Sequence, residues 1–450
     1  MLPLHDLRSE TGQTDFGRVL KRLRDTASPR SKIAASVDQI MGEVQTRRDA
    51  GLVNMMRAHT DPKFGASRVV VSTDDLDAAE RALNPDLRAA IERAIANVRA
   101  YQQHVMPADP DPITVSGARL GLRWGPVRKV GLYVPGGTAD LFSTLIMLAV
   151  PALVAGVKPE DIGVACPPPT RTKADYEKDD TLEPGDVSLL VLATAKLLGI
   201  GNVFRIGGAQ AIAALAYGTD RVPKVDLIAG PGNIYVQLAK GRLGGVCGTD
   251  NGFYGPSEIV TLADATANPA WVAADLIAQA EHNPGKCFLV AWEAAVIEAV
   301  LTEVDRQLHE RGRAEAITSA LAADSCAVLA PNRDAAIATV NDLAGEHVSL
   351  AVQDAEAVLD RVVDAGEVFL GHQTPVAAGD YHAGPSHCLP TGTTARYAGG
   401  VSVYTFLKRT GTVAYPEGMP AQTIDDIAKM AAAEGLDGHA ESARVRGTHD

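Results

Sequence analysis

The chain has 450 residues, 46% of them hydrophobic and 22% charged, which is the composition of a globular protein and excludes a disordered or collagen-like chain. Its net charge of -13 argues against a nucleic-acid binder and against a polybasic membrane anchor. Five scattered cysteines without a Cys-x-x-Cys pair predict neither a disulfide framework nor a thiolate zinc cluster. Because the N-terminus lacks a basic and then apolar signal, we expect a cytoplasmic protein.

The first 130 residues are expected to be mostly helical. Asn84 followed by Pro85 is typical of a helix start, because asparagine caps the first turn and proline is tolerated at the first helical position. From there to residue 104, apolar residues recur with helical spacing, with charged residues between them. This pattern predicts an amphipathic helix and indicates no chemistry.

From residue 128 onward, short β-rich runs alternate with longer helical runs. The first series predicts strands at 129–134, 161–165, 203–206 and 225–229, and helices at 141–154, 187–198, 209–217 and 234–243. Residues 167–186, which are rich in proline and charge, predict a solvated loop. Such alternation is typical of a parallel sheet covered by helices, with ligands at the carboxyl ends of the strands.

A second series begins near residue 258, with predicted strands at 258–262, 287–292, 327–329, 348–352 and 368–370, and helices at 269–281, 294–311, 335–344 and 355–364. The chain beyond residue 401 is too small to hold its own core, so we expect it to dock on a neighbour. We therefore predict an α/β fold with Rossmann-like parallel-sheet domains at 133–257 and 258–400. A helical part at 1–132 would pack with the second domain, and a small segment would occupy 401–450.

Three glycine turns follow strands of the first series, at residues 134–137, 207–210 and 230–233. Each joins a strand to a helix N-terminus, where backbone N–H groups can bind a phosphate or a carbonyl. The Gly-x-Gly-x-x-Gly fingerprint of dinucleotide-binding folds is absent. The turns are therefore compatible with one rim of a cofactor cleft and equally with plain tight βα turns.

Two short motifs of the second series combine imidazole with carboxylate or amide groups. Gln279 and His282 leave one face of a helix, as metal ligands or as an ordinary helix end. Glu346 and His347 lie at a predicted turn from helix to strand, where a carboxylate beside a base that titrates near neutral pH suits proton abstraction from an alcohol. A solvated loop pair is the alternative.

Two later motifs have the same character. Residues 379–387 combine Asp380 and His387 with glycine and proline, which suggests a metal or active site more than a surface turn. Glu434 and His439 form another acid–imidazole pair, on the terminal segment.

In this order, the motifs resemble the histidinol dehydrogenase family. The resemblance runs from about residue 128 to 445, and the matching strings lie at 131–137, 207–211, 229–236, 255–258, 273–282, 346–347, 379–387, 389–391, 402–403, 406–409 and 434–440. It implies oxidation of L-histidinol to L-histidine through an aldehyde, with two NAD, one zinc per subunit and a homodimer with shared active sites.

The resemblance also implies a role for individual residues. The implied zinc ligands are Gln279, His282, Asp380 and His439, of which His439 would reach into the partner's site, and the implied catalytic pair is Glu346 and His347. The implied substrate-binding residues are Ser257, His387 and Glu434, together with the zinc ligands and His347, and the implied NAD-binding residues are Tyr133, Gln210 and Asn233.

Four places depart from the family's usual pattern. The sequence differs at residues 141–144 and at Gly345, which precedes Glu346. Residues 249–254 are longer than usual and lie just before Ser257, and the polar loop at 167–186 is also longer than usual. The departure at 249–254 affects the identity of the substrate more than the type of reaction. The alternatives are therefore a related zinc- and NAD-dependent enzyme that oxidises another small polar alcohol, such as a sulfonated diol, and a non-catalytic α/β binding protein.

Overall fold

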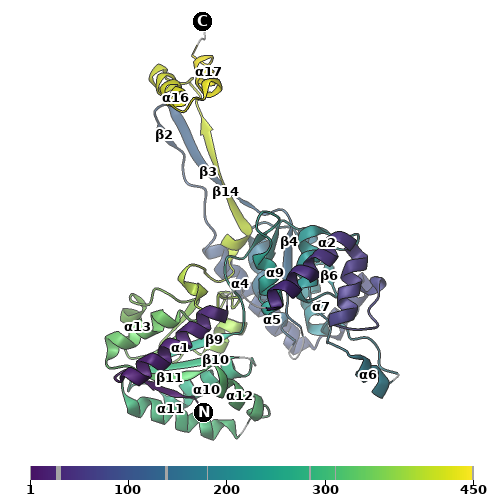
Figure 1. Cartoon of the computed structure of the whole chain (residues 1–450), viewed down its shortest axis with the longest axis vertical. Helices are drawn as coiled ribbons and strands as arrows, with labels where there is room; N and C mark the ends of the chain where they lie inside the picture. The colour runs from purple at the N-terminus through teal and green to yellow at the C-terminus, as the bar shows by residue number, and fades with distance from the viewer. Residues whose placement is uncertain are drawn as a thin grey trace.

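The computed structural model describes residues 2–26, 32–136, 140–179, 181–282, 285–309 and 311–447. Two parallel sheets carry helices on their faces, and a long arm projects away from them (Figure 1). In the part of the chain described, no helix is both long and apolar enough to cross a membrane.

The first parallel sheet has the strand order β6-β5-β4-β7-β8. Its strands are β4 (Val130–Tyr133), β5 (Ile162–Ala165), β6 (Asn202–Phe204), β7 (Leu227–Ala229) and β8 (Gly248–Thr249), and its helices are α5 (Phe142–Val154), α7 (Leu189–Leu197), α8 (Gly208–Tyr217) and α9 (Ile234–Gly241). The strand order reverses between β4 and β7, because the chain leaves β4 in one direction across the sheet and returns to it from the other side. Ligands of open α/β sheets bind at the carboxyl ends of the strands beside such a reversal.

The second parallel sheet repeats this order, with one added strand at its edge: β1-β11-β10-β9-β12-β13. Its strands are β1 (Leu4–Asp6), β9 (Glu258–Ala263), β10 (Lys286–Ala291), β11 (Cys326–Leu329), β12 (His347–Ala351) and β13 (Glu367–Leu370). Its helices are α1 (Glu10–Thr26), α10 (Pro269–Ala280), α11 (Ala294–Leu308), α12 (Ala314–Ala323), α13 (Arg333–Leu343), α14 (Ala355–Leu359) and α15 (Val376–Tyr381). The α/β prediction is thus confirmed for both series.

The N-terminal part divides between the two units, so the prediction that it packs with the second domain was only partly right. The edge strand β1 pairs with β11, and α1 contacts α13. The helices α2 (Lys32–His59), α3 (Thr73–Ala82) and α4 (Pro85–His104) instead contact α8, α7 and α5 of the first unit. Their apolar faces complete both cores of the first sheet, a pairing that helical periodicity alone cannot assign.

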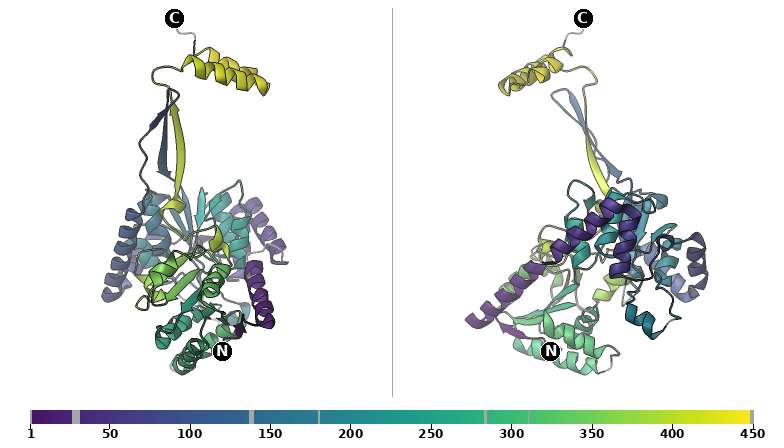
Figure 2. Two further views of the ribbon diagram at one scale, coloured as in Figure 1. Left: turned by 90° about the vertical axis from the view of Figure 1, so that its left-hand side faces the viewer. Right: turned by 45° about the vertical axis from the view of Figure 1, so that its right-hand side comes forward.

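The projecting arm joins two distant parts of the sequence (Figure 2). Strands β2 (Ile113–Val115), β3 (Ala118–Pro126) and β14 (Leu407–Ala414) form an antiparallel sheet, and α16 (Ala421–Ala433) and α17 (Asp437–Arg444) lie at its tip. The predicted segment 401–450 is therefore not a separate unit: Val401, Val403 and Phe406 belong to the first core, and the arm needs β3. Among the described residues, the buried hydrophobic cluster at the tip consists of Ala428, Ala431 and Ala440, as expected of a part too small to hold its own core.

The polar loop at 167–186 also differs from its prediction. It contains a short helix, α6 (Lys173–Lys178), which begins at a capping box formed by Thr172 and Asp175. Tyr176 of this helix donates its hydroxyl hydrogen to the buried carboxylate of Asp61, at 2.9 Å from each oxygen. The loop is thus anchored on the end of α2.

Candidate active site

A cavity of 620 Å³ lies where the two parallel units meet. From the first sheet, Pro135 follows β4 and the turn 231–233 follows β7, so the cavity opens at the strand-order reversal. From the second unit come the polar side chains of Ser257, His282, Glu346, His347, Asp380 and His387.

The second sheet faces this cavity with the amino ends of its strands, whereas the sequence predicted ligands at the carboxyl ends. Ser257 immediately precedes β9, and Glu346 and His347 lie at the start of β12, so the site is at the amino ends of these strands. Because β9 and β12 pair in parallel, with His347 opposite Ile259, the two starts are neighbours. The cavity therefore lies at carboxyl ends of strands, as expected of a ligand site, in the first sheet only.

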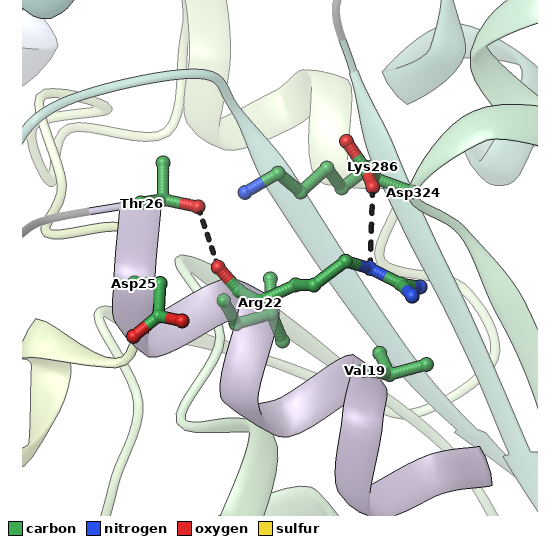
Figure 3. Close-up of a pocket in the computed structure, with 7 residues that line it drawn as sticks. Val19, Arg22, Asp25, Thr26, Lys286 and Asp324 are labelled. Carbon is green, nitrogen blue, oxygen red and sulfur yellow. Dashed lines mark hydrogen bonds and ion pairs between the residues drawn. The ribbon is translucent and has the colours of Figure 1, made fainter. Parts of the chain in front are cut away.

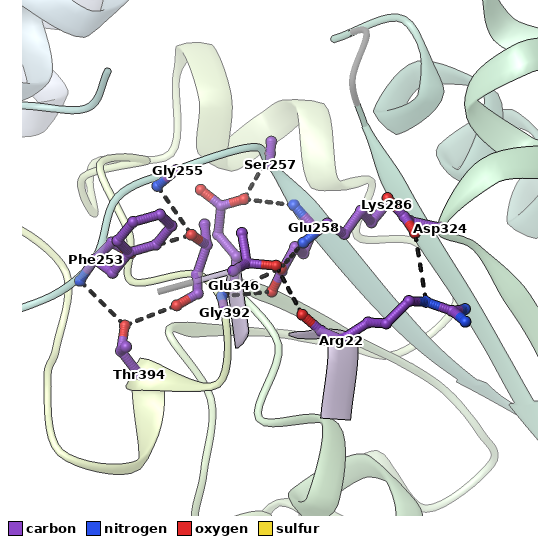
Figure 4. Close-up of polar contacts among 12 residues, drawn as sticks. Arg22, Phe253, Gly255, Ser257, Glu258, Lys286, Asp324, Glu346, Gly392 and Thr394 are labelled. Atoms are coloured by element: carbon purple, nitrogen blue, oxygen red, sulfur yellow. Dashed lines mark hydrogen bonds and ion pairs between the residues drawn. The ribbon is translucent and has the colours of Figure 1, made fainter. Parts of the chain in front are cut away.

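Glu346 is held by two donors on one carboxylate oxygen. Ser257 Oγ donates to Glu346 Oε2 at 2.6 Å, and the backbone N–H of Glu258 donates to the same oxygen at 2.7 Å (Figure 4). Burial raises the pKa of Glu346 well above its usual value, while these two hydrogen bonds oppose the rise. A buried carboxylate with a raised pKa is a stronger base than an exposed one, which suits it to accept a proton.

His347 has a fixed tautomer. Its Nδ1 lies 3.1 Å from the carbonyl oxygen of Glu258, and since a carbonyl only accepts, Nδ1 carries the hydrogen. Burial lowers the pKa of His347 to about 4, although Asp380 acts in the opposite direction, so the ring is neutral at pH 7. Within the described chain, Nε2 is buried without a hydrogen-bond partner, and its lone pair is available to an incoming hydroxyl.

The other two histidines of the cavity have the same orientation. His282 Nδ1 donates to the carbonyl of Gln279 at 3.2 Å, and His387 Nδ1 donates to the carbonyl of Asp380 at 2.8 Å. A backbone carbonyl on Nδ1 leaves Nε2 as the acceptor or metal-binding atom. His387 Nε2 accepts from Thr144 Oγ1 at 3.3 Å, whereas His282 Nε2 has no such contact among the described residues.

Three of the four implied zinc ligands lie in this region. His282 and Asp380 line the cavity, and Gln279 is buried one helical turn before His282, with an amide nitrogen that finds no partner in the described structure. An amide flip would instead leave the oxygen, a metal-binding atom, unpartnered. Imidazole, carboxylate and amide oxygen are donors that suit a divalent cation, so these residues fit one.

The fourth implied ligand lies elsewhere in this chain. His439 and Glu434 are exposed on the arm, at α17 and at the end of α16, away from both sheets (Figures 1 and 2). Accordingly, the described residues of one chain contain no group of three or more His, Cys, Asp or Glu side chains arranged to hold an ion. A site made of all four implied ligands would therefore need His439 from a second copy of the chain.

Sequence reasoning missed a buried polar network beside Glu346. The buried Glu258 accepts from Lys286 Nζ at 3.0 Å and from the backbone N–H of Gly392 at 3.2 Å (Figure 4). Lys286 also lines a separate 340 Å³ pocket under α1, where Arg22 lies 3.7 Å from Asp324 (Figure 3). The lysine and glutamate are 28 residues apart, so only the parallel pairing of β9 with β10 reveals the pair.

The three implied NAD-binding residues do not lie together. Asn233 lines the cavity and caps α9, accepting from the backbone N–H of Tyr235 at 3.0 Å. Tyr133 and Gln210 are buried near the start of α8, where Tyr133 Oη accepts from Gly208 N at 3.1 Å and Gln210 Nε2 lies 3.5 Å from Met56 Sδ. The apolar groups Pro135, Leu141, Pro231, Ile234 and Phe253 line the cavity beside the imidazoles, which fits the ring of a dinucleotide.

The glycine turns are explained largely by packing. A Cβ on Gly136 or Gly207 would meet Pro167 at 2.4 Å, and one on Gly230 would meet the carbonyl oxygen of Tyr133 at 2.2 Å. The N–H of Gly230 donates to Asp250 at 2.7 Å and that of Gly232 to the carbonyl of Tyr254 at 3.1 Å. With Gly208 N also engaged, these three amides are not available to a phosphate. Residue 137 of the first turn lies outside the described residues.

Comparison with known proteins agrees with this architecture. The family model described as histidinol dehydrogenase matches residues 23–447. The chain is 41% identical over 435 residues to the histidinol dehydrogenase of a Synechococcus strain, covering 96% of each chain, and 40% identical over 416 residues to that of Halobacterium salinarum, covering 92% of this chain and 93% of the relative. The crystal structure of histidinol dehydrogenase from Elizabethkingia anophelis superposes with a TM-score of 0.86 at 31% identity, covering 99% of this chain and 98% of that one. The chain therefore belongs to the histidinol dehydrogenase family and is an oxidoreductase that acts on a small molecule with a redox cofactor.

Proposed function

We propose that this chain oxidises L-histidinol to L-histidine through histidinaldehyde, the end of histidine biosynthesis, with zinc and NAD as cofactors and in the cytoplasm. The observation that carries the proposal is the neutral His347, whose unpartnered Nε2 faces a cavity that also holds Glu346, His282 and Asp380. A four-electron oxidation needs two proton acceptors at one place, and these two adjacent side chains can supply them.

His347 accepts the proton of the substrate's hydroxyl group. Its Nδ1–H is fixed on the carbonyl of Glu258, so Nε2 is the accepting atom. Because burial lowers the pKa of His347 to about 4, the imidazole is unprotonated across the neutral range. The resulting imidazolium would be stabilised by Asp380, whose Oδ1 lies 3.7 Å from Nε2.

Glu346 acts in the second oxidation, which begins from the hydrated aldehyde. Ser257 and the N–H of Glu258 hold one carboxylate oxygen, Oε2, and the other is left to take a proton from water. The raised pKa of Glu346 favours this proton transfer. His387, aligned by Thr144, would bind the substrate together with Ser257.

Gln279, His282, Asp380 and His439 of a second copy of the chain would hold the zinc. When bound, zinc and NAD supply substrate orientation and hydride acceptance. Asn233, Tyr133 and Gln210 would contact NAD. Glu434, also from the second copy, would pair with the ammonium of the amino alcohol, since a cation in a closed site needs an anionic partner. This arrangement requires a homodimer with shared sites, and it gives a role to Glu434 and His439, which are exposed at the tip of the arm.

The test follows NADH by absorbance and histidine by chromatography after L-histidinol is added. We expect two NADH for each histidine, and loss of turnover with a chelator that zinc restores. One NADH per turnover with release of free aldehyde would contradict the four-electron reaction.

A second candidate, oxidation of another small polar alcohol, is favoured by one observation. Phe253, from the segment 249–254 that departs from the family pattern, lines the cavity. A panel of polar alcohols read by NADH absorbance separates the two candidates: the highest kcat/KM with a sulfonated diol would favour the second, and the highest with L-histidinol the first.

A further inference from the structure

A second cavity, the basic groove, lies beside the first sheet and has no part in the chemistry above. It measures 670 Å³ and is formed by residues 54–62 at the end of α2 and residues 170–173 before and within α6. Four of its side chains can carry positive charge, namely Arg57, His59, Arg171 and Lys173. Of the described residues that line the groove, none is acidic, in a chain whose net charge is -13.

The two nearest carboxylates in sequence are already engaged. Asp61 is buried and accepts the hydroxyl hydrogen of Tyr176, and Asp175 accepts from Thr172 N at 2.6 Å in the capping box. By contrast, Arg171 Nε is buried without a hydrogen-bond partner anywhere in the described chain. Arg171 as a whole is only half-buried, and although its charge helps to lower the pKa of Asp175, its guanidinium can still bind an anion in the groove.

The groove lies on the same edge of the first sheet as the turns already described. Pro167, which contacts Gly136 and Gly207, follows the carboxyl end of β5, and four residues later Arg171 N donates to the carbonyl of Thr60 at 2.8 Å. Gln210 contacts Met56, whose carbonyl accepts from Thr60 N at 2.8 Å. The groove thus lies near Gln210, one of the implied NAD-binding residues, on the side of the β5 and α8 turns.

The side chains of the groove can be compared with those that distinguish NAD from NADP in other dinucleotide-binding folds. Folds that bind NAD commonly place a carboxylate on the ribose 2′-hydroxyl, whereas an arginine accommodates the 2′-phosphate of NADP. Here the groove offers cations and no carboxylate, and the amides of Gly208, Gly230 and Gly232 are engaged within the protein.

We propose that the basic groove binds a phosphate on the adenosine half of the dinucleotide, with Arg171 and Lys173 as its main contacts, so that this chain accepts the 2′-phosphorylated dinucleotide NADP. The inference rests on the proposed function, because it takes a dinucleotide to be the oxidant. It assigns a role to the loop at 167–186, which supplies both main contacts.

The test titrates the full-length protein by calorimetry with 2′,5′-ADP, 5′-AMP, inorganic phosphate, NADP and NAD. We expect 2′,5′-ADP to bind about tenfold or more tightly than 5′-AMP, because one charge-assisted phosphate contact is worth that much, and NADP to bind at least as tightly as NAD. High salt should reduce this preference. Equal or weaker binding of the phosphorylated ligands overturns the proposal, and tight binding of inorganic phosphate alone would make the groove a phosphate site rather than a dinucleotide site.

Two substitutions assign the effect to the groove. Arg171→Ala and Lys173→Gln should each reduce the ratio of 2′,5′-ADP to 5′-AMP affinity by about tenfold. Lys178→Gln, at the other end of α6, removes the same charge outside the groove and should leave the ratio unchanged. An unchanged ratio in both groove variants overturns the assignment, and because Lys173 is exposed, its substitution does not threaten the fold.

The same samples separate this inference from the proposed function. If L-histidinol is oxidised with NAD but 2′,5′-ADP shows no preference, the inference fails and the proposed function stands. If L-histidinol is oxidised with neither dinucleotide, the proposed function fails, and the titration with 2′,5′-ADP still decides whether the groove binds a phosphate.

Discussion

The two parallel sheets share one strand order, yet they meet the cavity with opposite ends. The first contributes the turns after β4 and β7, which are mainly apolar, from the carboxyl ends of its strands. The second contributes Ser257, Glu346 and His347 from the amino ends of β9 and β12. The strand-order reversal therefore predicts the position of the cavity on the first sheet. It does not predict that the second sheet faces the cavity with the amino ends of its strands. We infer a division of labour, with cofactor binding on the first sheet and proton transfer on the second.

The largest expected effect tests the proton-transfer side. His347→Asn should lower kcat by about 10²–10⁴-fold, because it removes the accepting Nε2, while the melting temperature changes little. Turnover is read by NADH absorbance with L-histidinol. His382→Asn is the matched control, since His382 is exposed and its ring Nδ1 lies 3.0 Å from Asn97 Nδ2 instead of lining the cavity. Near-normal turnover by the His347 variant would show that this residue of the second sheet is not the proton acceptor.

The next prediction tests whether the arm completes a neighbour's site. His347→Asn and His439→Asn should each be inactive alone, and mixing them after subunit exchange should restore about a quarter of wild-type activity, because half of the randomly paired dimers regain one intact site. A chain that carries both substitutions should remain inactive, because none of its dimers has an intact site. If mixing restores nothing although mass spectrometry detects mixed dimers, the sites are not shared.

A third prediction concerns the buried ion pair of the first unit. Lys240, which pairs with Asp250, also donates to the carbonyl of Gly230 at 2.9 Å and so supports the turn after β7. Lys240→Met should lower the free energy of unfolding by about 3–5 kcal/mol, because it leaves a buried carboxylate unpaired. Denaturant unfolding measures it, and the double change with Asp250→Leu should recover part of the loss. Burial raises the pKa of Asp250, so a small loss would mean that the carboxyl takes up a proton instead.

A fourth prediction tests the cofactor side. Asn233→Ala should raise the KM for NAD by about tenfold and lower kcat much less, because Asn233 lies at the first-sheet turn and not among the proton-transfer groups. Asn233→Ser is the control, since serine retains the cap of α9, which is worth about 1 kcal/mol. A loss confined to kcat would contradict the division between the sheets.

Local sequence patterns predicted the βα elements well, because each is bounded by glycine, proline or a capping residue. The start of α4 is an example: Asn84 Oδ1 accepts from Asp86 N at 2.9 Å, beside Pro85. The same patterns identified His282, Glu346, His347, Asp380 and His387, all of which line one cavity. Their assigned roles stay predictions.

What the sequence could not reveal depends on pairing between distant segments. The arm forms only because β3 pairs with β14, from Leu407 opposite Pro126 to Ala414 opposite Arg119, and β14 is almost wholly exposed, without the alternation that marks a strand. The amino-end site was missed because βα alternation gives the strand direction but not which edge of the second sheet faces the first. The Lys286–Glu258 pair likewise requires the register of two strands.

The smallest expected effect concerns the acid groups that the second unit buries around its site. Burial raises the pKa of Asp275, on α10, to about 6, and the nearby Asp380 adds to the rise. The folded state therefore holds this proton between about pH 4 and 6 while the unfolded state has lost it, so the contribution of Asp275 to stability is present below pH 4 and is lost as the pH rises through 6.

Asp275→Asn should remove this dependence, raising the free energy of unfolding by about 1 kcal/mol at pH 8 and leaving it nearly unchanged at pH 4, since Asp275 is only partly buried and solvent screens the rest. Denaturant unfolding at the two pH values measures the difference. Asp226→Asn, beside β7 of the first sheet, is the control, although Asp226 accepts from Lys129 N at 3.2 Å and a small uniform loss is expected. An equal gain in the free energy of unfolding at both pH values would show that Asp275 acts through packing and not through its ionisation.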